Sequence, residues 1–416
     1  MLLKSLQCVA LMAVLIESLS VVGAGARDGR NAGISSATAA EKAAEKVDVF
    51  AFGRERRALA LRTAPQIQEA LAPGLLFGSQ NPIFSAPGEA ANKITSAALK
   101  IDHMNAGLDA IVPPDAKLER VATGFTWVEG PIWIPAGYLL FAEITSNSIR
   151  KLTPDGSVSI FLQPSGYKGT APYGGKEPGS NGMTLDRSGR LTVAGHAHRD
   201  VWRLESLNPK GQVTVLADSY EGKKLNSPND LVYKSDGSLY FTDPPYGLPT
   251  QADNDPIKEL QVSGVYRIPK AFDQKPGAAP ARDQLQLLVK DLPRPNGIAF
   301  SPDEKYLYVA NSGTQKVWMR YRVKQDGTLA DAKVFYDASS DTRIGGPDGI
   351  KVDRQGNLYG TGPGGIWIFS PDGKPLGVIL VPERAANLNW GGADRKTLYI
   401  TASSSVYRVT LRVPGV

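Results

Sequence analysis

Cysteine is nearly absent from this chain, because only Cys8 of its 416 residues is a cysteine. Cys8 begins an apolar segment, CVALMAVLI, which follows Lys4 and precedes the small residues AGA at 24–26. This order is typical of a secretory signal peptide, although a buried N-terminal helix is an alternative. We therefore expect residues 1–26 to be removed and the mature protein to be periplasmic or secreted. It would then have no disulfide, cysteine nucleophile or cysteine metal ligand.

The sequence also lacks several other signals that would direct the search for a function. The apolar N-terminal run is shorter than the roughly 20 residues that span a bilayer, so we expect no membrane contact after signal cleavage. The net charge is +6, but no basic run is interleaved with aromatic residues, and we expect no nucleic-acid partner. A GxSxG motif is missing as well, so nothing indicates a serine nucleophile.

Residues 27–105 differ in composition from the rest of the chain. Segments such as ATAAEKAAEK and GRERRALALR are rich in alanine and charged residues and show no alternation of strands and turns. We interpret this region as a poorly structured or weakly helical N-terminal extension. An incorrectly assigned start of the chain is an alternative explanation for part of it.

The rest of the chain, from residue 106 onward, contains a repeated pattern of a polar residue and a short apolar strand. Six polar residues, here called the axial residues, each precede by ten or eleven positions the first leucine of a short apolar strand such as LYFTD or LYVAN. The axial residues are Glu129, Asn181, Asn229, Asn296, Asp348 and Asn387. The corresponding leucines are Leu139, Leu191, Leu239, Leu307, Leu358 and Leu398. The constant offset indicates one supersecondary unit that is copied six times.

Each unit reads as four short antiparallel strands that are joined by turns rich in glycine, aspartate and proline. Four strands that recur every 40 to 68 residues are typical of a β-propeller blade. The sixth unit lacks a fourth strand, whereas a spare strand at 118–123 precedes the first unit. We therefore predict an all-β, six-bladed propeller over residues 106–416, closed by pairing of 118–123 with 405–410.

In a propeller the first strand of each blade lies next to the central axis, so the axial residues should line the channel. Two of them, Glu129 and Asp348, are carboxylates and the other four are carboxamides. An oxygen-rich set with two negative charges suits one hard divalent cation. The alternative is that these residues only begin strands, since Asn and Asp are frequent in turns. Residues near the ends of the second strands should rim the same mouth: Glu143, His196, Asp243 and Asn311.

Several motifs resemble the gluconolactonase, senescence marker protein (regucalcin) and luciferin-regenerating enzyme family. They are VEGPIW, SNGMTLD, SPNDLV, YFTDPPYG, RPNGIAFSPD, LYVANS and GGPDGIKVD, in this order between residues 128 and 353. The resemblance implies a six-bladed propeller with one divalent metal ion, calcium first and zinc, magnesium or manganese as alternatives. It implies Glu129, Asn229, Asn296 and Asp348 as metal ligands, with Asp348 also as the general base. The chain departs from the family at Glu143, where bacterial members more often have Asp, and around His196.

Together these features predict an enzyme that hydrolyses a small-molecule lactone, such as gluconolactone. The metal ion would polarise the ring carbonyl, and Asp348 would accept a proton from the attacking water. Asn181, His196 and Tyr246 would bind sugar hydroxyls. A non-enzymatic propeller that binds a ligand or a partner is one alternative. An esterase or a strictosidine synthase-like enzyme of related architecture is another.

Overall fold

The computed structural model describes residues 93–416. The expected signal peptide, 1–26, and most of the expected extension, 27–105, lie outside the described residues. Within the described part the chain forms 28 strands and four short 3-10 helices. No helix in this part is long and apolar enough to cross a membrane.

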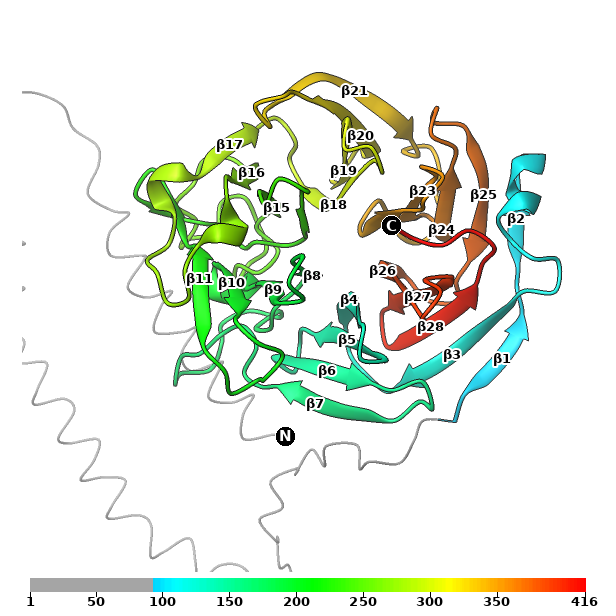
Figure 1. Cartoon of the computed structure of the whole chain (residues 1–416), viewed down its shortest axis with the longest axis horizontal. Coiled ribbons are helices and arrows are strands. Elements are labelled where there is room, and N and C mark those ends of the chain that lie inside the picture. The colour runs from blue at the N-terminus through cyan, green and yellow to red at the C-terminus, as the bar shows by residue number, and fades with distance from the viewer. Residues whose placement is uncertain (1–92) are drawn as a thin grey trace, which may run out of the picture. The chain divides into compact units, whose positions relative to one another are not determined.

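Six antiparallel sheets are arranged as blades around a central axis (Figure 1). In each blade the first strand lies nearest the axis and the later strands follow outward (Figure 1). Blade 1 contains β4 (Val128–Ile134), β5 (Tyr138–Glu143), β6 (Ser148–Leu152) and β7 (Val158–Leu162). Blade 2 contains β8 (Met183–Leu185), β9 (Leu191–Ala194), β10 (Val201–Leu204) and β11 (Val213–Ala217). Blade 3 contains β14 (Leu231–Tyr233), β15 (Leu239–Asp243), β16 (Gly264–Ile268) and β17 (Gln286–Val289).

The remaining three blades complete the ring that the sequence repeat predicts. Blade 4 contains β18 (Pro295–Phe300), β19 (Tyr306–Ser312), β20 (Lys316–Val323) and β21 (Leu329–Asp337). Blade 5 contains β22 (Ile350–Val352), β23 (Leu358–Gly362), β24 (Gly365–Phe369) and β25 (Pro375–Leu380). Blade 6 contains β26 (Ala385–Gly391), β27 (Thr397–Ala402), β28 (Ser405–Thr410) and β3 (Lys117–Thr123). The predicted six-bladed, all-β architecture is confirmed.

Short additional elements lie in the connections. They are the hairpin of β12 (Ser219–Tyr220) with β13 (Lys223–Lys224), and the 3-10 helices η1 (Ala106–Ala110), η2 (His196–His198), η3 (Ala271–Asp273) and η4 (Arg282–Gln284).

The turns between the first and second strands follow from their sequences. In the DRSG turn of blade 2, the Asp186 carboxylate accepts hydrogen bonds from the backbone N–H groups of Ser188 (2.9 Å) and Arg190 (3.0 Å). The DRQG turn of blade 5 repeats this arrangement, because Asp353 accepts from Gln355 and Asn357, both at 2.9 Å. An aspartate that binds the backbone two residues further on stabilises a tight turn and thereby fixes the register of the hairpin.

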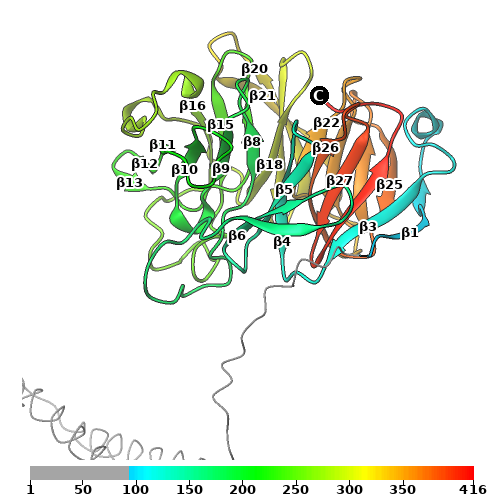
Figure 2. The ribbon, with the colours of Figure 1, turned by 60° about the horizontal axis from the view of Figure 1, so that its bottom comes forward.

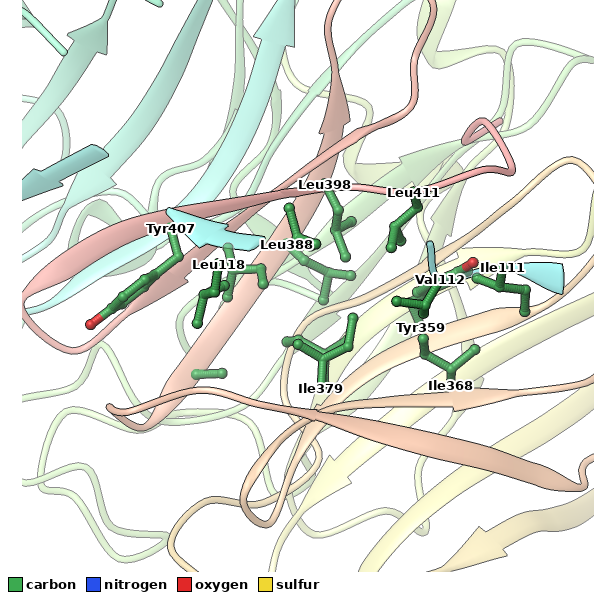
Figure 3. Packing of buried hydrophobic residues seen from close by; sticks show 14 of the residues in the cluster. Ile111, Val112, Leu118, Tyr359, Ile368, Ile379, Leu388, Leu398, Tyr407 and Leu411 are labelled. Carbon is green, nitrogen blue, oxygen red and sulfur yellow. The ribbon is translucent and has the colours of Figure 1, made fainter. Parts of the chain in front are cut away.

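The apolar core lies between adjacent blades rather than inside any one of them. Second strands such as β5 and β15 are buried on both faces, because a neighbouring blade covers each side. Figure 3 shows one of these layers, in which Leu118, Leu398 and Tyr407 of blade 6 pack in the same cluster as Tyr359 and Ile379 of blade 5. Burial on both faces explains why these strands read as nearly continuous apolar runs.

The ring is closed by the predicted pair of strands. β28 pairs antiparallel with β3, with Ser405 opposite Thr123 and Arg408 opposite Glu119. The Arg408 guanidinium binds the Glu119 carboxylate at 2.6 Å (Nε to Oε2). The closure joins segments that are almost 300 residues apart in the chain, and it leaves neither β28 nor the inner side of β3 as a free sheet edge.

We expected residues 27–105 to be poorly structured or weakly helical. This expectation is wrong at the C-terminal end of the region, where two strands form. β1 (Thr95–Ala98) pairs with the outer side of β3 (Figure 2), and β2 (Ile101–His103) pairs with β25 (Figure 1). β1 has the sequence TSAA and is fully exposed, so it carries no alternation of apolar and polar residues. Its pairing is provided by the open edge of β3, which a local sequence pattern does not reveal.

We expect Leu118→Ala to lower the free energy of unfolding by about 2–4 kcal/mol, because Leu118 is 7% exposed and fills the layer beneath the closing strand. Glu119→Gln, on the same strand, weakens only a partly exposed ion pair and should cost less than about 1 kcal/mol. Urea unfolding of both variants tests this. Equal costs would show that β3 contributes little to the core.

Candidate functional site

Neighbouring first strands approach each other closely at the axial residues. The glycine that follows an axial residue donates its N–H to the next blade: Gly182 to the carbonyl of Asn229 (2.7 Å) and Gly297 to that of Asp348 (3.1 Å). A Cβ atom on Gly182 would lie 2.6 Å from the Asn229 oxygen, and one on Gly297 would lie 2.1 Å from the Asp348 oxygen. The Asn-Gly pairs therefore serve contacts between blades and not tight turns.

These contacts bring five of the six axial residues to one cavity. Its volume is about 160 Å³, and its walls include Glu129, Asn181, Asn229, Asn296 and Asp348. The predicted substrate contact Tyr246 also lines it. The sixth axial residue, Asn387, is buried outside this wall. Its side chain hydrogen-bonds the Glu129 carboxylate, and its oxygen accepts the N–H of Leu388 at 2.8 Å. Five of the six axial residues thus line the cavity, and the sixth contacts one of them.

Three oxygens in this wall are buried and have no hydrogen-bond partner among the described residues: Oδ1 of Asn181, of Asn296 and of Asp348. The orientation of Asn296 is fixed, because its Nδ2 donates to Ser312 Oγ at 2.9 Å and leaves Oδ1 unpaired. Buried oxygens without a donor are unfavourable unless a cation or water binds them. This donor set fits a hard divalent ion, which takes carboxylate and carboxamide oxygens.

Carboxylates alone would not complete such a site. In residues 93–416, no three side chains of His, Cys, Asp or Glu gather as a conventional metal cluster. The donors at the axis are two carboxylates, Glu129 and Asp348, and the neutral carboxamides beside them. An ion at this position would depend on the carboxamide oxygens for most of its remaining protein ligands.

Burial strongly perturbs both axial carboxylates. Burial raises the pKa of Glu129 to about 7, against hydrogen bonds from the backbone of Gly130 and from Asn387 that lower it. The pKa of Asp348 is raised well above its usual range by burial and by the negative charge of Glu129, while Arg384 opposes the shift. Two buried like charges favour binding of either protons or a cation.

Tyr246 forms part of the same electrostatic environment. Burial, and then the negative charge of Asp348, raise the pKa of its hydroxyl to about 12, so it remains a hydrogen-bond donor at neutral pH. The guanidinium of Arg294 lies 5.3 Å from the centre of its ring. This cation–π contact holds the ring at the cavity wall.

The predicted rim residues have other roles in the structure. His196, in η2, is completely buried, and its Nε2 lies 2.9 Å from Oε2 of Glu177, which does line the cavity. Asp243 accepts the N–H groups of Asn226 (2.8 Å) and Ser227 (2.7 Å), and thus supports the loop that leads to Asn229. Glu143 pairs with Arg150 at 2.6 Å.

Asn311, the fourth rim residue, binds backbone groups. Its Oδ1 accepts the N–H of Arg294 at 3.0 Å, and its Nδ2 donates to the carbonyl of Gln315 at 2.9 Å. None of the four rim residues lies in the described wall of the cavity. They shape the loops behind it.

The sequence analysis missed five residues of the wall. They are Trp127, Glu177, Gln251, Ser312 and Arg384. Trp127 and Arg384 lie within three positions of an axial residue, and the Arg384 guanidinium is 5.3 Å from the Trp127 ring. Their short distance in sequence from an axial residue could have indicated that they line the cavity. Glu177 and Gln251 belong to long connections and carried no such signal.

Fold and cavity together define a six-bladed β-propeller with an oxygen-lined site on its axis. A sequence profile described as the SMP-30/Gluconolactonase/LRE-like region matches residues 127–404. The chain belongs to this family, as its motifs indicated.

Individual relatives extend the match over most of the chain. A gluconolactonase from Zymomonas mobilis is 39% identical over 340 residues, which cover 80% of this chain and 91% of the relative. The solved structure of a gluconolactonase from Xanthomonas campestris is 32% identical, with a TM-score of 0.64 and coverage of 77% and 98%. A calcium-binding regucalcin from Agrobacterium tumefaciens, at 18% identity, a TM-score of 0.53 and coverage of 71% and 96%, shares the fold.

In protein freed of divalent ions, we expect stability to fall as the pH rises from about 4.5 to 7. The folded protein keeps a proton on Glu129 up to about pH 7, whereas the unfolded chain releases it near the ordinary value of 4.5. Folding therefore becomes less favourable through this window, and the buried carboxyls of Asp243 and Asp348, whose pKa values are also raised, add to the loss. Urea unfolding at several pH values measures the effect, which Glu129→Gln should reduce. An unchanged pH profile in that variant would contradict the raised pKa.

Proposed function

We propose that this protein hydrolyses a sugar lactone, with an uncharged lactone such as gluconolactone as the first candidate. The observation that supports this most is the set of unpaired buried oxygens on the axis, of Asn296 and Asp348 beside Glu129. The chain matches nearly the whole length of two gluconolactonases, so the proposal draws on whole proteins and not on a shared fragment.

Glu129, Asn229, Asn296 and Asp348 would hold one divalent metal ion. The donors are all oxygens and two are charged, so we propose calcium first, with zinc, magnesium or manganese as alternatives. Such an ion supplies Lewis-acid polarisation of the lactone carbonyl when it is bound.

The remaining chemistry falls to the side chains of the cavity. Asp348, with one unpaired carboxylate oxygen, would accept a proton from the water that attacks the lactone carbonyl. The water oxygen forms the new C–O bond, the ring C–O bond breaks, and the ring oxygen leaves as a hydroxyl after taking up a proton. The product is the open hydroxy acid.

Substrate binding would involve the polar wall around this centre. Tyr246 and Asn181 line the cavity and would bind sugar hydroxyls. His196 would act on the substrate through Glu177, because its side chain is completely buried and its Nε2 lies 2.9 Å from the Glu177 carboxylate, which lines the cavity. Trp127 supplies an apolar face.

Export remains a prediction, since residues 1–26 lie outside the described part. N-terminal sequencing of the natively produced protein tests whether the mature chain begins near Arg27.

Asp348→Asn should lower kcat for lactone hydrolysis about 100-fold or more, because it removes the proposed base and retains an oxygen ligand. Proton release from D-glucono-1,5-lactone, corrected for spontaneous hydrolysis, measures it. Asn181→Ala is the comparison and should raise KM with a smaller effect on kcat. Hydrolysis by Asp348→Asn at the parental rate, with metal bound, would rule out this role.

Removal of divalent ions should abolish lactone hydrolysis, and calcium should restore it and raise the thermal midpoint. A ligand at about 100 times its Kd stabilises a folded protein by roughly 2.7 kcal/mol. Asn296→Ala should lose most of this calcium-dependent shift, because one oxygen ligand is removed, whereas Glu259→Gln, on an exposed carboxylate outside the described cavity wall, should keep it. Differential scanning calorimetry and metal analysis measure both. Equal shifts in the two variants would exclude Asn296 as a ligand.

A further inference from the structure

Glu177 is the one carboxylate of the cavity wall that neither the sequence repeat nor the proposed metal site uses. It lies in the connection between β7 and β8, and its side chain is 20% exposed. It lines the cavity together with Asp348, Arg384 and Tyr246.

Two residues from other parts of the ring fix this carboxylate. Nε2 of the fully buried His196 lies 2.9 Å from Oε2 of Glu177. The Gln251 side chain, on the connection between β15 and β16, donates to Oε1 of Glu177 at 2.8 Å and to the carbonyl of Tyr246 at 3.0 Å. Each carboxylate oxygen has two acceptor positions, so one on each oxygen is still available to a ligand. The arrangement presents Glu177 as a preorganised acceptor.

The charges around the cavity set what this acceptor can bind. Three carboxylates line it, those of Glu129, Glu177 and Asp348, and the one guanidinium in the described wall is that of Arg384. A divalent ion and Arg384 together balance the three negative charges. The guanidinium of Arg294, close by, already binds Asp253 at 3.2 Å. The wall therefore offers no surplus positive charge to an anionic group.

We propose that Glu177 determines the substrate specificity of this site. Its carboxylate accepts hydrogen bonds from hydroxyls of an uncharged, polyhydroxylated lactone, and it repels lactones that carry a phosphate, sulfonate or carboxylate group. His196 and Gln251 are positioning residues that hold the carboxylate in place. This inference rests on the proposed lactonase function.

Three lactones test the inference with the full-length protein loaded with its metal ion. They are D-glucono-1,5-lactone, 6-phospho-D-glucono-1,5-lactone and δ-valerolactone, which has neither hydroxyls nor charge. Glu177→Gln keeps the shape of the side chain and removes the charge. Glu259→Gln is a matched control on an exposed carboxylate that is outside the described cavity wall.

In Glu177→Gln, the ratio of kcat/KM for the uncharged sugar lactone to that for the phosphorylated one should fall about tenfold or more. KM for the uncharged sugar lactone should rise several-fold, and δ-valerolactone should be affected least. Glu259→Gln should behave as the parent. His196→Gln should shift the ratio in the same direction by a smaller factor.

Two outcomes would overturn the inference while the lactonase function stands. One is a change in the ratio of less than about twofold in Glu177→Gln. The other is an equal loss for all three lactones, which would indicate a structural role. If the parent hydrolyses none of the three with calcium, zinc, magnesium or manganese, the proposed function itself fails, and this inference with it.

Discussion

Hydrogen bonds between β3 and β28 hold the ring closed, and every feature of the cavity depends on that closure. Without it, blade 6 would lack its outer strand, and β26 would lose part of the support that holds it against β4. A separate apolar layer lies between each pair of neighbouring blades, and blade 6 contributes to two of them, toward blade 5 and toward blade 1. The axial residues come from blades that are far apart in the chain, and only a complete ring brings their oxygens together.

The cavity concentrates acidic and neutral oxygens among side chains that are mostly buried. Burial makes the charged forms of Glu129 and Asp348 unfavourable, and their mutual repulsion adds to this. A divalent cation would offset both the burial of the two carboxylates and their repulsion, because its positive charge would stabilise their ionised forms. The same low-dielectric surroundings strengthen every polar contact that a substrate could make with Tyr246 or Glu177.

The parts of this structure that follow a repeat could be predicted from the sequence, and the parts outside it could not. The constant offset between an axial residue and its leucine predicted the six blades and five residues of the cavity wall, and the missing fourth strand of the sixth unit predicted the closing strand. The offset does not determine how a side chain is oriented, and Asn387 lies outside the wall with its side-chain oxygen bound to the N–H of Leu388. The repeat also did not predict β1 and β2. These edge strands form because a neighbouring strand offers free backbone hydrogen-bonding groups, and their own sequences carry no strand pattern. Glu177 and Gln251 lie in two different connections, between β7 and β8 and between β15 and β16. The folded ring brings them into contact, and no spacing in the sequence indicates that contact.

The hydrogen bonds between neighbouring first strands limit how this fold can change during evolution. Repeat proteins usually gain or lose whole units, because each unit contacts only its neighbours through similar surfaces. Here the backbone of one blade sets the position of the next axial residue, as when Gly297 binds the carbonyl of Asp348. If recombination exchanged a single blade, the backbone hydrogen bonds to its neighbours would change. The axial oxygens of the exchanged blade and of the next blade would then both be displaced. Near the axis the six units are therefore inherited as one, while their outer strands and connections remain free to diverge.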